Sequence, residues 1–170
     1  MFKKRFLNRK NMKCVYCNQP IFIRNLCKKC FIRSFEKRVR KELRGKLRKD
    51  SRIWVKNPVC RDFMKYLGMP LKFVRSNYDY EISFWTLDDE CESFLTKMFK
   101  GINLKVEHSK KNIKLFRTIP EKEVIVYAKL KGFDVKSKTS AERSWLDQIS
   151  EKFKETKFSL LKSIDEIKSL

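Results

Sequence analysis

Apolar residues between positions 31 and 47 recur every three or four positions, which places them on one face of a helix. These residues are Ile32, Phe35, Val39 and Leu43. The pattern predicts a helix over Phe31–Leu47 whose other faces are polar and strongly basic. The basic residues on those faces include Arg33, Lys37, Arg40, Lys41 and Arg44.

Further segments carry helix signals, mostly start and stop residues around amphipathic or charged stretches. Gly68 closes one of them, and Thr86 or Asp88 caps the start of another. Pro120 leads a third, which Gly132 closes. The expected helices are Arg61–Leu67, Leu87–Lys100, Glu121–Lys131, Ala141–Phe153 and a short segment near Asp165–Leu170.

Short runs of apolar and β-branched residues predict strands. They are Ile21–Ile23, Arg52–Val55, Leu71–Arg75 and Glu81–Trp85. The lysine-rich stretch Asn103–Thr118 is expected to be a loop. Because strands alternate with helices after residue 48, we expect an α/β fold, with a reduced, mostly parallel sheet flanked by helices.

The strongest chemical signal is a group of four cysteines near the N-terminus, spaced C-V-Y-C, nine residues, C-K-K-C. Each Cys-x-x-Cys turn offers two thiolates to one ion, and two such turns fill the four positions of tetrahedral Zn²⁺. The expected ligands of this zinc knuckle, which precedes the α/β domain, are Cys14, Cys17, Cys27 and Cys30. Such a site has no open coordination position, so its role would be structural rather than catalytic.

Disulfides are the alternative use of these cysteines, and the cellular compartment decides between the two. Segment 1–13 is basic, but no apolar stretch follows it, so it does not resemble a secretory signal. A reducing, cytoplasmic location is therefore expected, and there paired knuckles favour a metal over disulfides. The remaining cysteines, Cys60 and Cys91, are either reactive thiols or, as we expect, small buried apolar residues.

The charge of the chain indicates a polyanionic partner. Its 170 residues carry a net charge of +22, and by count residues 1–52 contribute +16 of it. A field of this strength attracts nucleic acid or an anionic membrane surface, or it serves solubility alone. Of these, nucleic acid is the partner that we expect, and a membrane is not. No apolar run approaches the eighteen or so residues of a membrane span.

The knuckle and the helix behind it supply the candidate residues for binding nucleic acid. These are Arg24, Lys28, Lys29, Arg33, Lys37, Arg40, Lys41 and Arg44. Aromatic side chains beside basic ones can stack on bases, and Tyr16, Phe22 and Trp54 are either such contacts or core residues. The one histidine, His108, lies among lysines with no nucleophile near it in sequence, so we expect a surface residue rather than a catalytic one.

Four segments together resemble the tRNA 2-thiouridine synthetases, or tRNA thiolases, which carry an N-type ATP pyrophosphatase domain. They are the knuckle with the start of its helix (C-V-Y-C to C-K-K-C-F-I-R-S-F-E-K-R-V-R), Leu87–Gly101, Ile119–Gly132 and Thr156–Ile167. The segments occur in the family's order, and the most specific part is L-D-D-E followed by I-P-E-K-E-V. The resemblance implies an ATP-pyrophosphatase-like α/β fold and tRNA as the partner.

The family's chemistry, as the resemblance implies it, requires an S-G-G-K-D-S loop directly after the first strand. Its glycines let backbone N–H groups hold the phosphates of ATP. Here the strand Arg52–Val55 is followed by K-N-P-V-C, which has no glycine, and Pro58 removes a donor. The triplet Lys49-Asp50-Ser51 precedes the strand instead of following it. The phosphate-binding loop is therefore missing from its expected place.

The resemblance implies two further sets of residues, and this sequence departs from both. The family's cysteines for an iron–sulfur cluster or sulfur relay have no counterpart between Arg75 and Trp85 or directly after Gly132. The family's G-H-N-L-D-D-E turn reads F-W-T-L-D-D-E, with bulky residues where a nucleotide would approach. Asp88 and Asp89 are then either ligands for nucleotide and Mg²⁺ or, as we expect, first-turn residues that favour the helix dipole.

We therefore expect a truncated, degenerate relative of the tRNA thiolases that contains zinc, binds RNA, with tRNA as the leading candidate, and lacks the family's catalysis. Its expected parts are a basic arm (1–13), a zinc knuckle with a basic helix (14–47) and an ATP-pyrophosphatase-like domain (48–170). The alternative is a non-catalytic partner or regulator of a full-length thiolase paralogue, either form allowing a homodimer or heterodimer. A third hypothesis is a residual enzyme whose missing loop comes from another chain.

Overall fold

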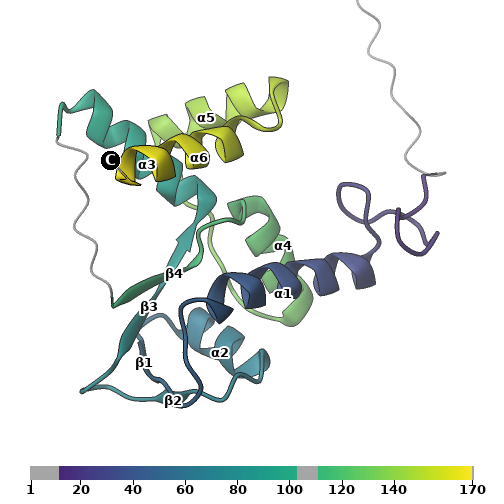
Figure 1. The fold of residues 1–170 in the computed structure, drawn as a ribbon. Helices are drawn as coiled ribbons and strands as arrows, with labels where there is room; N and C mark the ends of the chain where they lie inside the picture. The colour runs from purple at the N-terminus through teal and green to yellow at the C-terminus, as the bar shows by residue number, and fades with distance from the viewer. Residues whose placement is uncertain (1–11, 103–110, 170) are drawn as a thin grey trace, which may run out of the picture. The chain divides into compact units, whose positions relative to one another are not determined.

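The computed structural model describes residues 12–102 and 111–169 of the chain (Figure 1). The expected basic arm 1–13 lies almost entirely outside these residues, as does His108. The chain divides into two compact units, Met1–Glu42 and Leu43–Leu170, each with its own internal packing.

The first unit contains two knuckle loops and most of a long helix, α1 (Lys28–Arg44). The loops form isolated antiparallel bridges, one of them between Ile23 and Leu26. The strand expected at Ile21–Ile23 is wrong, because the chain reverses direction directly after it and leaves no room for a ladder. Helix α1 begins and ends three residues earlier than expected, so that it starts inside the second knuckle.

The second unit is built on a four-stranded sheet in which every pair of neighbours is parallel. The strand order is β2-β1-β3-β4. The strands are β1 (Arg52–Val55), β2 (Lys72–Phe73), β3 (Tyr80–Thr86) and β4 (Asn112–Phe116). The expected α/β fold with a parallel sheet flanked by helices is thus confirmed.

Strand β4 corrects the loop expected over Asn103–Thr118. Ile113 and Leu115 are buried while Lys114 between them is half-exposed, which is the alternation typical of a strand. The lysines and the exposed Asn112 around these two positions hid the pattern in the sequence. Strand β1 has its expected bounds, and β2 is shorter than expected.

The connection between β2 and β3 crosses β1 in only six residues. Phe73 and Tyr80, at its two ends, are both register partners of Ile53. Parallel strands usually need a dozen or more connecting residues, but β2 is so short that the chain has little distance to return. Within this connection, the ring of Tyr78 stacks on that of Trp54, with centroids 5.4 Å apart.

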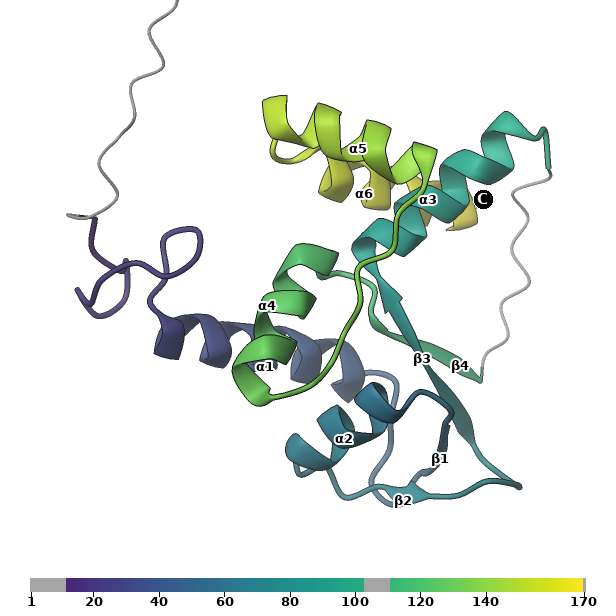
Figure 2. The ribbon, with the colours of Figure 1, turned by 180° about the vertical axis from the view of Figure 1, so that it is seen from behind.

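The helices of the second unit beyond the end of α1 are α2 (Pro58–Tyr66), α3 (Leu87–Phe99), α4 (Glu121–Lys131), α5 (Ala141–Lys152) and α6 (Thr156–Ser169). Helix α2 packs on β1 and β3, whereas α5 and α6 pack on α3, as Figure 2 shows from behind. Helix α6 corrects the short segment expected near 165–170, because it already begins at Thr156. None of the described helices is both long and apolar enough to cross a membrane.

Aromatic rings and aliphatic side chains form two apolar clusters in this unit. Phe63 of α2 contacts Phe116 and Tyr127 edge-on, with centroid distances of 5.2 and 5.5 Å. The second cluster joins α3 to α5 and α6 through Leu87, Cys91, Phe94, Leu95, Leu146, Leu161 and Ile164. Cys60 and Cys91 are fully buried, which confirms that both are core residues, and this burial raises the pKa of each thiol to about 12.

We predict that Phe63→Ala destabilises the second unit by about 3–5 kcal/mol, because it removes a buried ring and leaves a cavity between α2, β4 and α4. Urea unfolding at equilibrium measures this change. The control is Phe99→Ala at an exposed position near the end of α3, which should cost less than about 1 kcal/mol. Equal costs for the two variants would contradict the assignment of Phe63 to the core.

Candidate metal centre and nucleic-acid interface

The first knuckle is shaped by backbone hydrogen bonds that turn the chain around Cys14 and Cys17. The Cys14 N–H donates to the carbonyl of Gln19 at 2.8 Å, and the Asn18 N–H donates to the carbonyl of Cys14 at 3.1 Å. Asn18 has a φ of 58°, a left-handed conformation that asparagine tolerates better than most residues. This turn brings the two thiols of the knuckle to the same side of the loop.

The second knuckle is continuous with the start of α1. The Phe31 N–H donates to the carbonyl of Cys27 at 2.9 Å, so Cys27 lies at the helix N-terminus and Cys30 in its first turn. The Cys30 N–H also approaches the Cys27 sulfur at 3.4 Å. Free N–H groups and the positive end of the helix dipole favour negative sulfur at this position.

The structure brings all four predicted ligands together, with their Sγ atoms within 4.8 Å of one another. The Sγ of Cys17 lies 3.4 Å from that of Cys27 and 3.5 Å from that of Cys30. A tetrahedral ion with metal–sulfur bonds of about 2.3 Å separates its sulfurs by about 3.8 Å, so the group fits a single metal ion. All six cysteines of the chain carry free thiols.

The thiols of this group share their negative charge unevenly. Although burial opposes ionisation, backbone hydrogen bonds at Cys27 and Tyr16 lower the pKa of Cys14 to about 6. The side-chain hydrogen bond with Cys17 and burial raise the pKa of Cys30 to about 12. Four adjacent thiolates repel one another, so full ionisation requires a bound cation, and metal binding releases protons.

On helix α1 the buried positions are apolar and the exposed positions are basic. Its buried positions are Phe31, Phe35, Val39 and Leu43. Every exposed position of α1 is basic, namely Lys28, Lys29, Arg33, Lys37, Lys41 and Arg44, and we call these six residues the basic stripe. Of the remaining RNA-binding candidates, Arg40 is half-buried on the same helix and Arg24 is exposed in the loop before it.

The basic stripe is long and continuous. Lys29, Arg33, Lys37 and Lys41 follow one another at four-residue spacing, which places them along one side of the helix. At 1.5 Å per residue the stretch from Lys29 to Arg44 is about 22 Å long, whereas Lys28, seven residues before Phe35, lies at the start of the apolar face. Such a row of cations suits a polyanion with regularly spaced charges.

The three aromatic candidates for base stacking differ in exposure. Tyr16 is 74% exposed and Phe22 is 47% exposed, both in the knuckle loops. Trp54 is half-buried on β1, where the ring of Tyr78 already stacks on it. Two of the three therefore present a ring to solvent, and Trp54 is a packing residue.

Three consecutive acids at the start of α3 were the other candidates for chemistry, and all three are buried. Asp88 accepts a hydrogen bond from the Glu121 N–H at 2.6 Å and forms an ion pair with Lys157. Lys157 also contacts Asp147 at 2.5 Å. Asp88 thus links the start of α3 to α4 and α6.

Asp89 is both a helix cap and an ion-pair partner. Its carboxylate accepts hydrogen bonds from the backbone and hydroxyl of Thr86 at 2.8 and 2.9 Å, and the Thr86 hydroxyl accepts from the Asp89 N–H, which completes a capping box. Its other oxygen contacts Arg143 at 2.6 Å and Lys138 at 2.8 Å. Arg143 in turn contacts Glu121 at 2.8 Å.

Glu90 has more cationic neighbours than either aspartate. Lys114, Lys168 and Arg117 approach its carboxylate at 2.5, 2.6 and 3.3 Å. The indole N–H of Trp85 donates to it at 2.8 Å. Burial opposes the charge, yet hydrogen bonds from Lys114 and Lys168 lower the pKa of Glu90 from 4.5 to about 2.

The acids of the L-D-D-E motif lie in the first turn of α3, as expected for Asp88 and Asp89. Their ion pairs within the chain were not part of that expectation. Their partners were not among the residues selected from the sequence. Lys157 and Arg143 lie 69 and 54 residues from the aspartates they contact. The sequence contained only an indirect signal for these ion pairs. Adjacent acids in an apolar segment require cationic partners when they are buried.

Comparisons with known proteins give a match at the level of the fold. No family model matches the sequence, and no curated protein matches it. Solved structures do match, including the U34-tRNA thiolase NcsA from Methanococcus maripaludis with its [4Fe-4S] cluster. The TM-score is 0.68 at 17% sequence identity, and the match covers 93% of this chain and 88% of that chain. The chain therefore has a tRNA-thiolase-like fold.

We predict one metal ion per chain, held by the four knuckle cysteines. The double variant Cys17→Ser, Cys30→Ser should lose the ion and loosen the first unit, while the second unit keeps its cooperative unfolding. The control is Cys60→Ala, which removes a thiol elsewhere and should leave the metal content unchanged. Elemental analysis of the purified proteins measures the metal, and a metal-free wild type or a disulfide among these cysteines would contradict the prediction.

We also predict that acid weakens the fold through Glu90. Its folded pKa is about 2, below the ordinary 4.5, so the unfolded chain binds a proton that the folded chain does not. The stabilisation is complete above about pH 4.5 and is lost as the pH falls toward about 2, by an amount on the order of 3 kcal/mol.

Urea unfolding at several pH values tests this, with Glu90→Gln as the variant and the exposed Glu155→Gln as the control. Glu90→Gln should be less stable at pH 7 and should lose less stability between pH 4.5 and 2 than the wild type does. The control should follow the wild-type profile. A Glu90→Gln profile parallel to that of the wild type would show that another group carries the acid sensitivity.

Proposed function

We propose that this protein binds RNA, with tRNA as the substrate class, through the basic stripe of α1, and that it has lost the ATP chemistry of the tRNA thiolases. The observation that carries the proposal is the separation of residues on α1, where every exposed position is Lys or Arg. A helix that needed only solubility would carry acids as well as bases on its exposed face. Here the acids of α1, Glu36 and Glu42, are only half-exposed.

The fold supports tRNA as the class of RNA. The solved structure with the same fold is described as a U34-tRNA thiolase. Folded RNA is recognised mainly through its phosphates and its shape, and a row of lysines and arginines meets that requirement without sequence readout. The exposed rings of Tyr16 and Phe22 in the knuckle loops can add stacking on unpaired bases.

We propose Zn²⁺ as the metal of the first unit, held by Cys14, Cys17, Cys27 and Cys30. The close grouping of the four sulfurs supports a single ion, because an iron–sulfur cubane stands between its ligands and holds them farther apart. A zinc ion in this site would supply folding free energy rather than catalysis. Four thiolates around Zn²⁺ leave a net negative charge, which the neighbouring Lys28 and Lys29 offset.

Two features support the loss of ATP chemistry. Only Lys56 and Asn57 lie between β1 and α2, and the Asn57 side chain accepts a hydrogen bond from the Cys60 N–H, so it caps α2. A glycine-rich phosphate loop has no room in this connection. The acids of α3 are already bound by the chain's own cations.

The proposed parts of the chain remain a basic arm (1–13), a zinc knuckle with its basic helix (14–47) and an α/β domain (48–170). The proposed location is reducing and cytoplasmic.

One observation favours the alternative function, in which the protein is a partner for a thiolase paralogue. Met98, Phe99 and Ile102 at the end of α3 are exposed by 51, 70 and 50%. Adjacent exposed apolar residues of this kind occur at protein contacts.

Removal of the stripe tests RNA binding. We predict that replacing four of its residues by Ala lowers affinity for tRNA and flattens the dependence of log K on log salt by about 3, since each lost phosphate contact removes about 0.7–0.9 from the slope. The fold should survive, because these side chains lie opposite the apolar face. The four substitutions are Arg33→Ala, Lys37→Ala, Lys41→Ala and Arg44→Ala.

The matched control removes the same charge from exposed positions of the second unit. Its substitutions are Lys56→Ala, Lys65→Ala, Lys129→Ala and Lys162→Ala. If both quadruple variants lose equal affinity, binding follows net charge and not the stripe. If neither loses affinity while Phe99→Glu abolishes capture of a thiolase paralogue, the partner alternative replaces RNA binding.

A further inference from the structure

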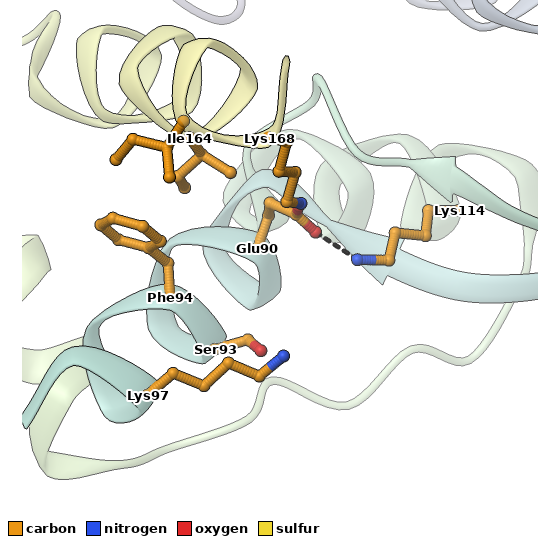
Figure 3. Close-up of a pocket in the computed structure, with 8 residues that line it drawn as sticks. Glu90, Ser93, Phe94, Lys97, Lys114, Ile164 and Lys168 are labelled. Carbon is orange, nitrogen blue, oxygen red and sulfur yellow. Dashed lines mark hydrogen bonds and ion pairs between the residues drawn. The ribbon is translucent and has the colours of Figure 1, made fainter. Parts of the chain in front are cut away.

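A small hollow opens between α3, β4 and α6, within the second unit, and Figure 3 shows the side chains around it. Its volume is about 40 Å³. Since a water-sized group needs about 10–15 Å³ by this measure, the hollow has room for about three such groups. That space suits a small oxyanion and is too small for a whole nucleotide.

Cations outnumber acids around this hollow. Lys97, Lys114 and Lys168 line it together with one acid, Glu90. Arg117 also contacts Glu90, at 3.3 Å, and forms its own ion pair with Asp165. The group therefore carries more positive charge than its own carboxylates neutralise.

The donors of these cations are only partly used. Both oxygens of Glu90 already accept from Lys114, Lys168 and the indole of Trp85. An ammonium has three N–H donors, and Lys168 shows one hydrogen bond, the one to Glu90. With Arg117 at 3.3 Å as a fourth neighbour, the roughly four acceptor sites of this carboxylate are occupied, so N–H donors remain around it.

Two further donors face the same space. Ser93 and Lys97 lie three and seven residues after Glu90 on α3, hence on the same face of the helix. Both residues line the hollow together with Glu90 and Lys114, and Figure 3 draws their hydroxyl and ammonium ends below the Glu90–Lys114 ion pair. Among the described residues, neither group has a hydrogen-bond or ion-pair partner.

Apolar side chains close the hollow on its other side. Phe94 of α3 and Ile164 of α6 both belong to the buried cluster that joins these helices. An apolar wall limits the access of water, so charges in the hollow attract an anion more strongly than they would on an open surface. Burial and the nearby charges of Lys168 and Arg117 lower the pKa of Lys114 in spite of Glu90. A bound anion would relieve that crowding of cations.

We propose that this hollow binds a phosphate group through Lys97, Ser93 and the free donors of Lys114 and Lys168. On the proposed function of RNA binding, on which this step rests, the group is a backbone phosphate of the bound RNA. The hollow then contributes a defined contact of its own, in addition to the basic stripe of α1. A free phosphate compound is the other source of the same chemistry, and the experiment separates the two.

The first arm titrates the full-length protein with inorganic phosphate and follows the backbone amide signals of Ser93 and Lys97 by ¹H–¹⁵N NMR. Sodium chloride at equal ionic strength is the reference. The variant is Lys97→Glu, and its matched control is Lys100→Glu, an exposed lysine three positions further on. Phosphate-specific shifts should occur in the wild type and in Lys100→Glu and should be absent in Lys97→Glu.

The second arm measures affinity for tRNA with the same three proteins. A hydrogen-bonded phosphate contact to a charged group is worth about tenfold or more in affinity, so Lys97→Glu should bind at least about tenfold more weakly. Lys100→Glu changes the same charge outside the hollow and should lose less than about threefold. The salt slope should fall by about 0.7–0.9 in Lys97→Glu alone.

Each outcome tests a different part of the proposal. An absence of phosphate-specific shifts in the wild type overturns the site. Shifts in the first arm with equal affinity losses for Lys97→Glu and Lys100→Glu overturn the RNA assignment and leave a site for a free phosphate compound. If the wild type does not bind tRNA at all, the proposed function fails, while the phosphate arm still decides whether the hollow is an anion site.

Discussion

The burial of three consecutive carboxylates at the N-terminus of α3 constrains the whole second unit. A buried charge without a partner is so costly that each acid must be paired or protonated. Asp88, Asp89 and Glu90 are all paired. Their cations come from four places in the chain: strand β4, the segment between α4 and α5, helix α5 and helix α6. The α5–α6 pair therefore packs on α3 with a fixed orientation, which apolar contacts alone would specify less strictly.

The same pairing bears on what the α/β unit can do. A carboxylate that already accepts from an ammonium, a guanidinium or an indole has little capacity to coordinate Mg²⁺. In this chain Arg143 and Lys157 bind the two aspartates that could otherwise act as ligands. The proposal of a fold retained without its ATP chemistry rests on this substitution of internal cations, together with the short connection from β1 to α2.

The two units use their positive charge in different ways. In the first unit the exposed residues of α1 are all basic, and the knuckle cysteines gather at the start of that helix. In the second unit six basic side chains pair with the buried acids of α3. Lys97, which lines the hollow beside Glu90, has no acidic partner among the described residues. Basic side chains without acidic partners, in both units, account for the preference for phosphate that we propose.

The sequence by itself determined whatever depends on neighbouring residues. The four-residue spacing of Phe35, Val39 and Leu43 gave the apolar face of α1 and hence its basic stripe. Two Cys-x-x-Cys turns gave the metal ligands, because each turn brings its own two thiols together. Pro120 and Gly132 gave the bounds of α4, since one favours a helix start and the other ends it in the left-handed conformation. The alternation in β4 covers only Ile113, Lys114 and Leu115, which is too short among lysines to identify a strand in the sequence. Only the tertiary structure decided that β4 is a strand and that distant cations pair with the acids of α3, because these contacts join residues more than 20 positions apart.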